Sequence, residues 1–297
     1  MLLLLLLFLL LFLPSTTSST LSLDSWSSSL TNPPATTKKK QFFGGSFKTT
    51  AKPKSKTKST DSVKTDLSKI SEIYVPTSSW DLCTPENLLN PSTLTSLYSN
   101  SELFLDSKDF KPLDKIDLTS PSAINIWTLN PPPGYFGSEY TIIKTSSYIK
   151  ASPKKITDLI MDSSRVKVYN SISKGRIDKQ VIGKDIDRID KIVLNRTRPP
   201  MQKVDCLFKT LMSSRSNGEG YLIVSRGCVI PDSELDGCKH STIILGFNRV
   251  SREGGGTRLE GVTWVEAKGV PGVVARKIGV KGGRDFVKCL RKVFEGE

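Results

Sequence analysis

The sequence predicts an α+β fold in which a curved antiparallel sheet wraps around a long C-terminal helix. Two observations lead to this prediction. Four segments of the last third alternate apolar and polar residues between turns, at 204–214, 220–230, 241–250 and 257–267. After them, apolar residues recur at helical spacing, at Val274, Ile278, Phe286, Leu290 and Val293. The apolar stripe of such a helix must cover something, and the concave face of the sheet is the large apolar surface that the sequence offers.

The N-terminal sixty residues differ in composition from the rest. Residues 1–13 are a Leu- and Phe-rich run that Pro14 ends, and at about 1.5 Å per residue the run is too short for a hydrocarbon core of about 30 Å. We therefore expect residues 1–20 to be a signal-like leader that directs the chain into the secretory pathway. The alternatives are an uncleaved signal anchor and a wrongly chosen start codon, which would leave the protein in the cytoplasm.

Residues 21–62 are rich in Ser, Thr, Lys and Pro and lack periodicity, which is typical of a disordered linker or a transit segment. Leader and tract together resemble the two-part presequence used by algae with secondary plastids. Eight lysines and one acid, Asp24, give residues 1–60 half of the formal charge of +14. The predicted folded domain spans residues 63–297 and is best supported from residue 120.

The reactive side chains argue against several enzyme classes. A single histidine, His240, excludes most catalytic triads and His-rich metal sites, which need imidazoles in defined places. No two cysteines have the spacing of a zinc or redox site, so we expect free thiols at Cys83, Cys206, Cys228, Cys238 and Cys289. We expect no catalytic residue, no metal and no cofactor. Aromatic and basic residues are not interleaved, so we also expect no nucleic-acid partner.

Local signals predict the other elements. Helical patterns occupy 63–74 and 85–103, and strands are predicted at 124–129, 139–150, 176–182 and 188–198. Ser152 and Pro153 predict the start of a helix that ends near Ser163, because serine is favoured at the N-cap and proline at the first helical position. Asn217-Gly218 is a strong hairpin signal. Strands and helices do not alternate regularly, which disfavours a parallel nucleotide-binding sheet.

Three sequence motifs in the second half of the chain occur in a defined order. The first is SPKKITDLI at 152–160 with SRVKVYN at 164–170, and the second is VDC at 204–206 with NGEGYLIVSR at 217–226. The third is KGVP at 268–271 with DFVKCLRK at 285–292. Together they resemble the motifs of START domains, the lipid-transfer domains related to steroidogenic acute regulatory protein. The resemblance covers roughly residues 120–297.

The resemblance implies a helix-grip fold in which the sheet and the C-terminal helix enclose a tunnel for one lipid. It implies lipid binding and lipid transfer between membranes by a monomer that contacts a membrane surface transiently. It leaves open whether the lipid is a sterol, a phospholipid or another class. The alternative is an enzyme of a related helix-grip class, a cyclase or a hydrolase, acting on a hydrophobic ligand in the same cavity.

Strand alternation gives the residues that would line the tunnel. The uncharged face of the strand at 204–214 is expected to be the inner face, as is the face of the last strand opposite Arg258, Glu260 and Glu266. With the helix stripe, the candidate ligand-binding residues are Phe208, Thr210, Met212, Leu259, Thr263, Val265, Val274, Ile278, Phe286 and Leu290.

Thr210 departs from the START pattern. Counted from Asp205, it stands where many START domains have a buried arginine that meets the polar end of the lipid. The anchoring of a sterol hydroxyl or a phosphate therefore cannot be transferred to this chain. Arg196 and Arg198 are the candidate replacements, and solvent exposure is the alternative for each.

The closing helix has three glycines near its middle, Gly279, Gly282 and Gly283. Each costs about 1 kcal/mol relative to alanine, so we expect a weak or kinked helix there. We expect its first segment, 272–278, to swing away and admit lipid while 284–294 stays docked. Its basic residues are expected either to meet anionic headgroups or to form a solvated face, and they are Arg276, Lys277, Lys281, Arg284, Lys288, Arg291 and Lys292.

Overall fold

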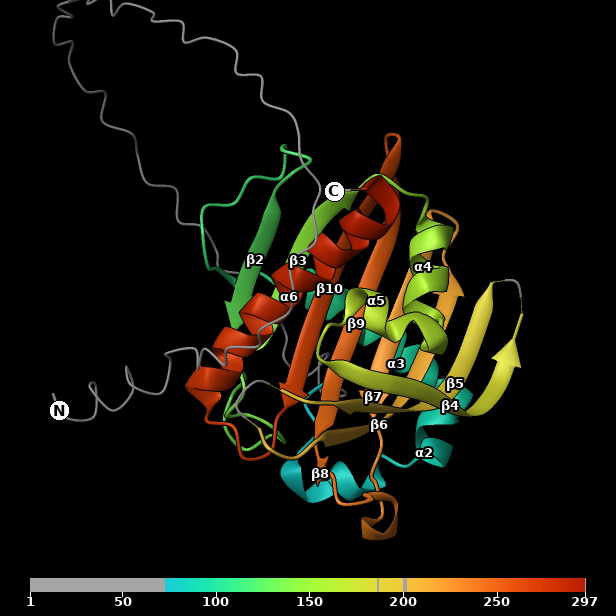
Figure 1. Ribbon diagram of the computed structural model, residues 1–297, viewed down its shortest axis with the longest axis vertical. Helices are drawn as coiled ribbons and strands as arrows, with labels where there is room; N and C mark the ends of the chain where they lie inside the picture. The colour runs from blue at the N-terminus through green and yellow to red at the C-terminus, as the bar shows by residue number, and fades with distance from the viewer. Residues whose placement is uncertain (1–72, 186, 200–201, 297) are drawn as a thin grey trace, which may run out of the picture. The chain divides into compact units, whose positions relative to one another are not determined.

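The computed structural model describes residues 73–185, 187–199 and 202–296 (Figure 1). Among these residues, ten strands form one curved sheet in the order β1-β2-β3-β10-β9-β7-β6-β5-β4, with β8 beside β6. All pairs are antiparallel except β6 with β8. The expectations for the leader, the linker and most of the helix at 63–74 concern residues outside those described.

The eight predicted strands are present, with ends that differ by a few residues. They are β2 (Ile124–Leu129), β3 (Ile142–Ile149), β4 (Ser173–Lys184), β5 (Arg188–Thr197), β6 (Cys206–Ser216), β7 (Gly220–Gly227), β9 (Thr242–Glu253) and β10 (Gly256–Glu266). Two more strands were not predicted, β1 (Lys111–Pro112) and β8 (Lys239–His240). Two residues are too few to show an alternation, so such strands leave no signal in the sequence.

The helices follow their capping signals. Ser152 accepts a hydrogen bond from the Lys155 amide and begins α4 (Pro153–Met161), which is followed by the short α5 (Val166–Tyr169). The irregular helix predicted at 85–103 is two helices, α2 (Pro85–Leu89) and α3 (Pro91–Leu105). They separate at Asn90, because the residue before a proline disfavours helical dihedrals and the Asn90 side chain caps the second helix.

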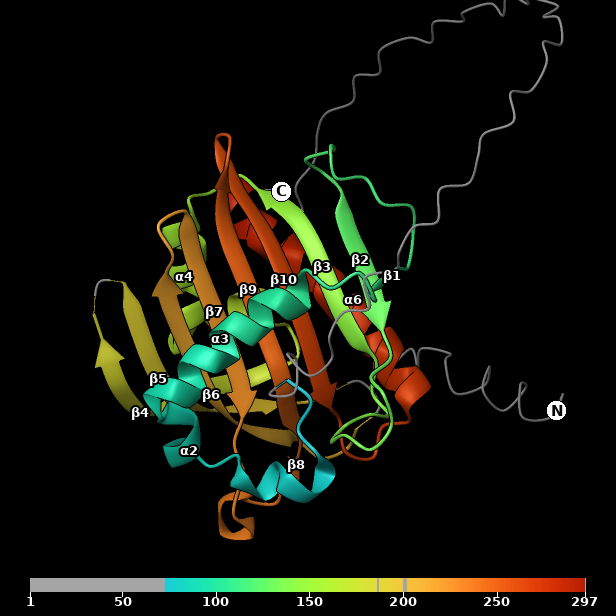
Figure 2. The same ribbon diagram turned by 180° about the vertical axis from the view of Figure 1, so that it is seen from behind.

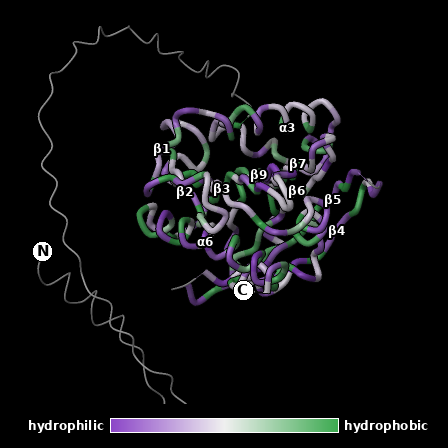
Figure 3. Tube along the Cα trace, turned by 90° about the horizontal axis from the view of Figure 1, so that it is seen from above, coloured by the Kyte–Doolittle hydropathy of each residue, from purple (hydrophilic) through white to green (hydrophobic). Residues whose placement is uncertain are grey.

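Helices cover both faces of the sheet (Figures 2 and 3). The convex face carries α2 and α3 over a large apolar cluster that includes Trp264 and Phe247. The concave face carries α4, α5 and α6 (Gly272–Glu295) over a second cluster that includes Ile223 and Leu290. The predicted grip of a curved sheet on a long C-terminal helix is therefore confirmed.

The helix α6 runs without a break from Gly272 to Glu295, and its expected weakness at the glycines stays a prediction. Gly279 and Gly283 lie one turn apart on the side that packs against β3. A Cβ atom would lie 3.2 Å from Ile143 Cγ1 at Gly279 and 2.8 Å from Thr145 Cγ2 at Gly283. These two glycines therefore let the helix approach the sheet closely, whereas a Cβ atom at Gly282 would meet no other segment within 4 Å.

Candidate functional site

Strand register places five residues in one row across the concave face. From β6 to β3 they are Met212, Ser225, Gly246, Thr263 and Ile143, each the direct partner of the next. Exposure changes along this row. Met212 and Ile143 are buried at its two ends, Ser225 and Gly246 are half-buried, and Thr263 is exposed. The middle of the concave face is therefore accessible to solvent.

One end of the concave face is filled by side chains. Three of the predicted lining residues, Met212, Leu259 and Leu290, belong to the apolar cluster beneath α4, α5 and the C-terminal half of α6. A fourth, Phe286, is partly buried and packs against that cluster. The Phe286 ring packs edge-on against Tyr169, with ring centroids 5.7 Å apart. In this part of the grip, the predicted residues form a packed core.

The other end of the face has a different character. Thr263 is exposed, Val265, Val274 and Ile278 are half-buried, and none of these four belongs to an apolar cluster of the described residues. Phe208 is buried but is likewise outside the clusters. Apolar side chains left partly exposed on a concave surface are typical of ligand sites. We name this part of the face, between the N-terminal half of α6 and β6, β7, β9 and β10, the open end.

A β-bulge adds a residue that the sequence analysis did not identify. The register between β9 and β10 shifts between Trp264 and Val265, so Ile243 lies opposite Val265 on the concave face. Ile244 and Leu245 both point to the convex core as a result. The signal in the sequence is the apolar run at 243–245, which breaks the alternation of the strand.

Thr210 lies on the concave face between Val193 of β5 and Gly227 of β7. It is 1 % exposed, and within the described residues its Oγ1 atom has no hydrogen-bond partner. A buried hydroxyl without a partner loses about 1–3 kcal/mol relative to one that is satisfied. The described residues therefore do not supply the hydrogen-bond partner that Oγ1 of Thr210 requires.

Arg196 and Arg198, the candidates to replace the buried arginine of START domains, each form an ion pair with an aspartate. Arg196 donates to Asp236 at 2.7 Å and Arg198 donates to Asp205 at 2.6 Å. Their side chains are 41 % and 50 % exposed, which agrees with the alternative of solvent exposure.

Lys191 is a buried cation of the concave face that the sequence analysis missed. Its ammonium donates to the Met161 carbonyl at 2.5 Å, to Asp178 at 2.9 Å and to Ser163 at 3.0 Å. Burial lowers the pKa of Lys191. Three partners satisfy an ammonium group, so Lys191 ties the end of α4 to the sheet and leaves no donor for a ligand. The signal was a lysine between Ile189 and Val193 on the face that alternation assigns to the core.

The polar groups named so far at the open end are uncharged. They are the hydroxyls of Thr210, Ser225 and Thr263, and within the described residues no cluster of acids, histidine and cysteines is arranged to hold a metal. All five cysteines are free thiols, as predicted. Such a surface suits an apolar molecule that carries a small uncharged polar group.

Comparison with known proteins finds no match in sequence, either to a family model or to a curated protein. Solved structures are similar in fold. Human StAR-related lipid transfer protein 5 superposes with a TM-score of 0.56 at 11 % identity, covering 69 % of this chain and 96 % of that protein. Human STARD10 superposes with a TM-score of 0.54 at 13 % identity, covering 69 % of this chain and 81 % of that protein.

The lipid transfer and protein localization domain of human StarD13 gives a TM-score of 0.52 at 14 % identity, over 69 % of this chain and 98 % of that domain. At these identities the likeness shows the fold. The described chain therefore has a START-like helix-grip fold, as its motifs indicated.

Proposed function

We propose that the protein binds one lipid at the open end of the concave face and carries it between membranes. The observation that carries this proposal is the row of residues across the sheet. A filled core buries a row throughout, whereas Thr263 in this row is exposed, and Val265 and Ile243 nearby are half-buried. Apolar surface of this kind gains about 25 cal/mol per Å² when a ligand covers it.

The proteins of similar fold support the same function, because two of the three named above are described as lipid-transfer proteins or domains. The neutral lining supports a lipid whose polar end is uncharged, such as a hydroxyl or an ester. Thr210 would donate to that group or accept from it, in place of the arginine of many START domains.

The outer face of α6 supports a transient contact with an anionic membrane. Its exposed basic residues are Arg276, Lys277, Lys281, Lys288 and Lys292. Lys281 also pairs with Asp285 on the same helix, and two other basic residues of α6 are engaged within the protein. Arg284 pairs with Asp114, and Arg291 is 7 % exposed, so both expectations for Arg291, headgroup contact and a solvated face, are wrong. Among the described helices, none combines the length and the apolar composition that a membrane span requires.

Native mass spectrometry of the full chain, followed by extraction and identification of the bound molecule, tests the proposal. We expect one lipid per chain. Thr263→Trp should remove the lipid by filling the open end, and Ser99→Trp, at an exposed site of α3 on the opposite face, should not. A chain that holds no lipid and takes none from labelled vesicles would contradict the proposal. Chemical conversion of the bound lipid would instead identify the cyclase or hydrolase alternative.

A further inference from the structure

A small pocket lies on the convex face, on the other side of the sheet from the open end. It occupies about 90 Å³ between the N-terminal half of α3 and the strands β5 and β6. Figure 2 shows this end of α3 beside these strands. The pocket is lined by Pro91, Leu94, Thr95, Tyr98, Arg188 and Arg215. None of these residues belongs to the lipid site proposed above.

Two arginines face each other across the pocket. Arg188 of β5 and Arg215 of β6 are direct partners in the antiparallel register, so both side chains stand on the convex face. Side chains in directly opposite positions lie about 4.5–5.5 Å apart at Cβ, where like charges repel. A pair of this kind is stabilised by an anion placed between the two guanidinium groups.

The nearby acid neutralises only one of the two charges. Asp190 is 2 % exposed, and its carboxylate accepts from Arg188 Nε at 2.6 Å. Its other oxygen accepts from the Ser213 hydroxyl, which in turn is 2.8 Å from the Tyr98 hydroxyl. Both carboxylate oxygens of Asp190 therefore already accept hydrogen bonds within the protein, beneath the pocket.

Arg215 keeps its charge without an acidic partner. Its guanidinium carbon lies 3.9 Å from the centre of the Tyr98 ring, and in the part of the chain that the structure describes Arg215 forms no ion pair. Stacking on the ring fixes the plane of the guanidinium and leaves its N–H edges for a planar or tetrahedral oxyanion. Burial raises the pKa of Tyr98, so its hydroxyl stays protonated and donates to Ser213, whose own proton goes to Asp190.

We propose that this pocket binds a phosphate group, held by Arg215 and Arg188 with Thr95 at the rim. Arginine forks match phosphate oxygens in bidentate geometry, and the volume suits one phosphate but not a nucleotide. The group comes either from free phosphate or from the headgroup of a phospholipid. The site is independent of the proposed lipid site, since the sheet separates the two.

Titration calorimetry of the full chain with inorganic phosphate tests the site, with sodium chloride added to hold the ionic strength constant. We expect saturable binding that Arg215→Gln weakens about 10- to 100-fold, because a hydrogen bond to a charged group contributes about 1.5–3 kcal/mol. Arg252→Gln removes an exposed arginine of β9 that does not line the pocket, and it should bind phosphate like the unmodified chain. Circular dichroism checks that both variants are folded.

A second experiment identifies the source of the phosphate group. Retention on vesicles that contain phosphatidic acid falls in Arg215→Gln if the headgroup is the ligand, and it stays unchanged if the ligand is free phosphate. Lipid occupancy by native mass spectrometry should be the same in Arg215→Gln and the unmodified chain, which separates this site from the proposed lipid site. An unmodified chain without saturable binding, or equal affinities for phosphate in Arg215→Gln and the unmodified chain, would overturn the proposal.

Discussion

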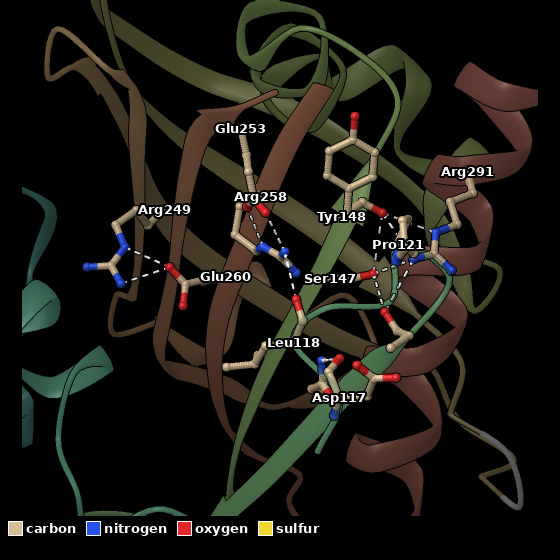
Figure 4. Close-up of polar contacts among 12 residues, drawn as sticks. Asp117, Leu118, Pro121, Ser147, Tyr148, Arg249, Glu253, Arg258, Glu260 and Arg291 are labelled. Atoms are coloured by element: carbon tan, nitrogen blue, oxygen red, sulfur yellow. Dashed lines mark hydrogen bonds and ion pairs between the residues drawn. The ribbon is translucent and has the colours of Figure 1, made fainter. Parts of the chain in front are cut away.

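Arg291 of α6 and Ser147 of β3 are joined by a hydrogen bond of 2.6 Å (Figure 4). The same guanidinium donates to the carbonyls of Tyr148, Pro121 and Ser122 at 2.8–3.3 Å. One side chain thus connects the last turns of the helix to a strand and to the loop that precedes β2. It fixes the C-terminal half of α6, next to the filled part of the concave face.

Replacing Arg291 by leucine should destabilise the protein. The change removes the donor from several partly buried carbonyl groups and from the buried Ser147 hydroxyl, so we expect the free energy of unfolding to fall by about 2–4 kcal/mol. Denaturant unfolding measures this difference. The matched control is Lys292→Leu, at the exposed neighbouring position, which should stay within about 0.5 kcal/mol of the unmodified chain. Equal effects of the two changes would show that the contacts of Arg291 contribute little.

The two halves of α6 should differ in hydrogen exchange. Val273 is 73 % exposed, and the first turn begins at Pro271 without a side-chain cap, whereas Arg291 secures the last turns. We expect amides of residues 272–278 to exchange faster than those of 284–294, as a lid that opens to admit lipid requires. Exchange detected by mass spectrometry resolves the two segments. Uniform protection along the helix would rule out this lid.

The glycines of α6 should respond in opposite ways to larger side chains. Gly283→Leu places atoms where Thr145 already lies, so we expect a loss of about 1–3 kcal/mol as the helix is pushed away from β3. Gly282→Ala meets open space and should gain up to about 1 kcal/mol from helix propensity. Thermal unfolding of the two variants compares them. Similar changes in both would mean that the close approach at Gly283 is not needed.

The basic outer face of α6 should make vesicle binding depend on salt. Replacing Lys277, Lys288 and Lys292 by glutamine removes about 1 kcal/mol each, so affinity for anionic vesicles should fall about 100-fold at low salt. Vesicle flotation at several salt concentrations measures this affinity. The control replaces three exposed lysines of β4, Lys174, Lys179 and Lys184. Loss of binding in the control alone would place the membrane contact elsewhere.

Alkaline pH should weaken the convex core through Tyr74. Burial, with smaller contributions from Asp109 and Tyr135, raises the pKa of Tyr74 from 10.0 to about 12. A pKa that is higher in the folded state stabilises the fold below pH 10, and this stabilisation is lost as the pH rises through 12. Unfolding measured between these values should show a steeper loss than in Tyr74→Phe. Tyrosinate absorbance assigns the titration, and identical profiles in the two proteins would refute the assignment.

Local patterns in the sequence were enough to predict the strands, most helices and the inner faces of β6 and β10. Alternation and capping depend on residues close in the chain, so they can be read without knowing the partners. The two-residue strands were not predicted because they are too short to establish a period. The bulge at Ile243 was not predicted because it interrupts the alternation of β9. The burial of Arg291 was not predicted either, because helix periodicity does not show which carbonyl oxygens a neighbouring loop places next to the helix.

The sequence by itself determined that a curved sheet would grip the last helix and which side chains would face inward. Only the tertiary structure decided which of those side chains are covered. Leu290 and Phe286 are packed because Gly279 and Gly283 let α6 approach β3 and Arg291 holds it there, while Thr263 stays exposed. The physical reason is that alternation assigns a residue to a face, whereas burial depends on contacts between segments far apart in the chain.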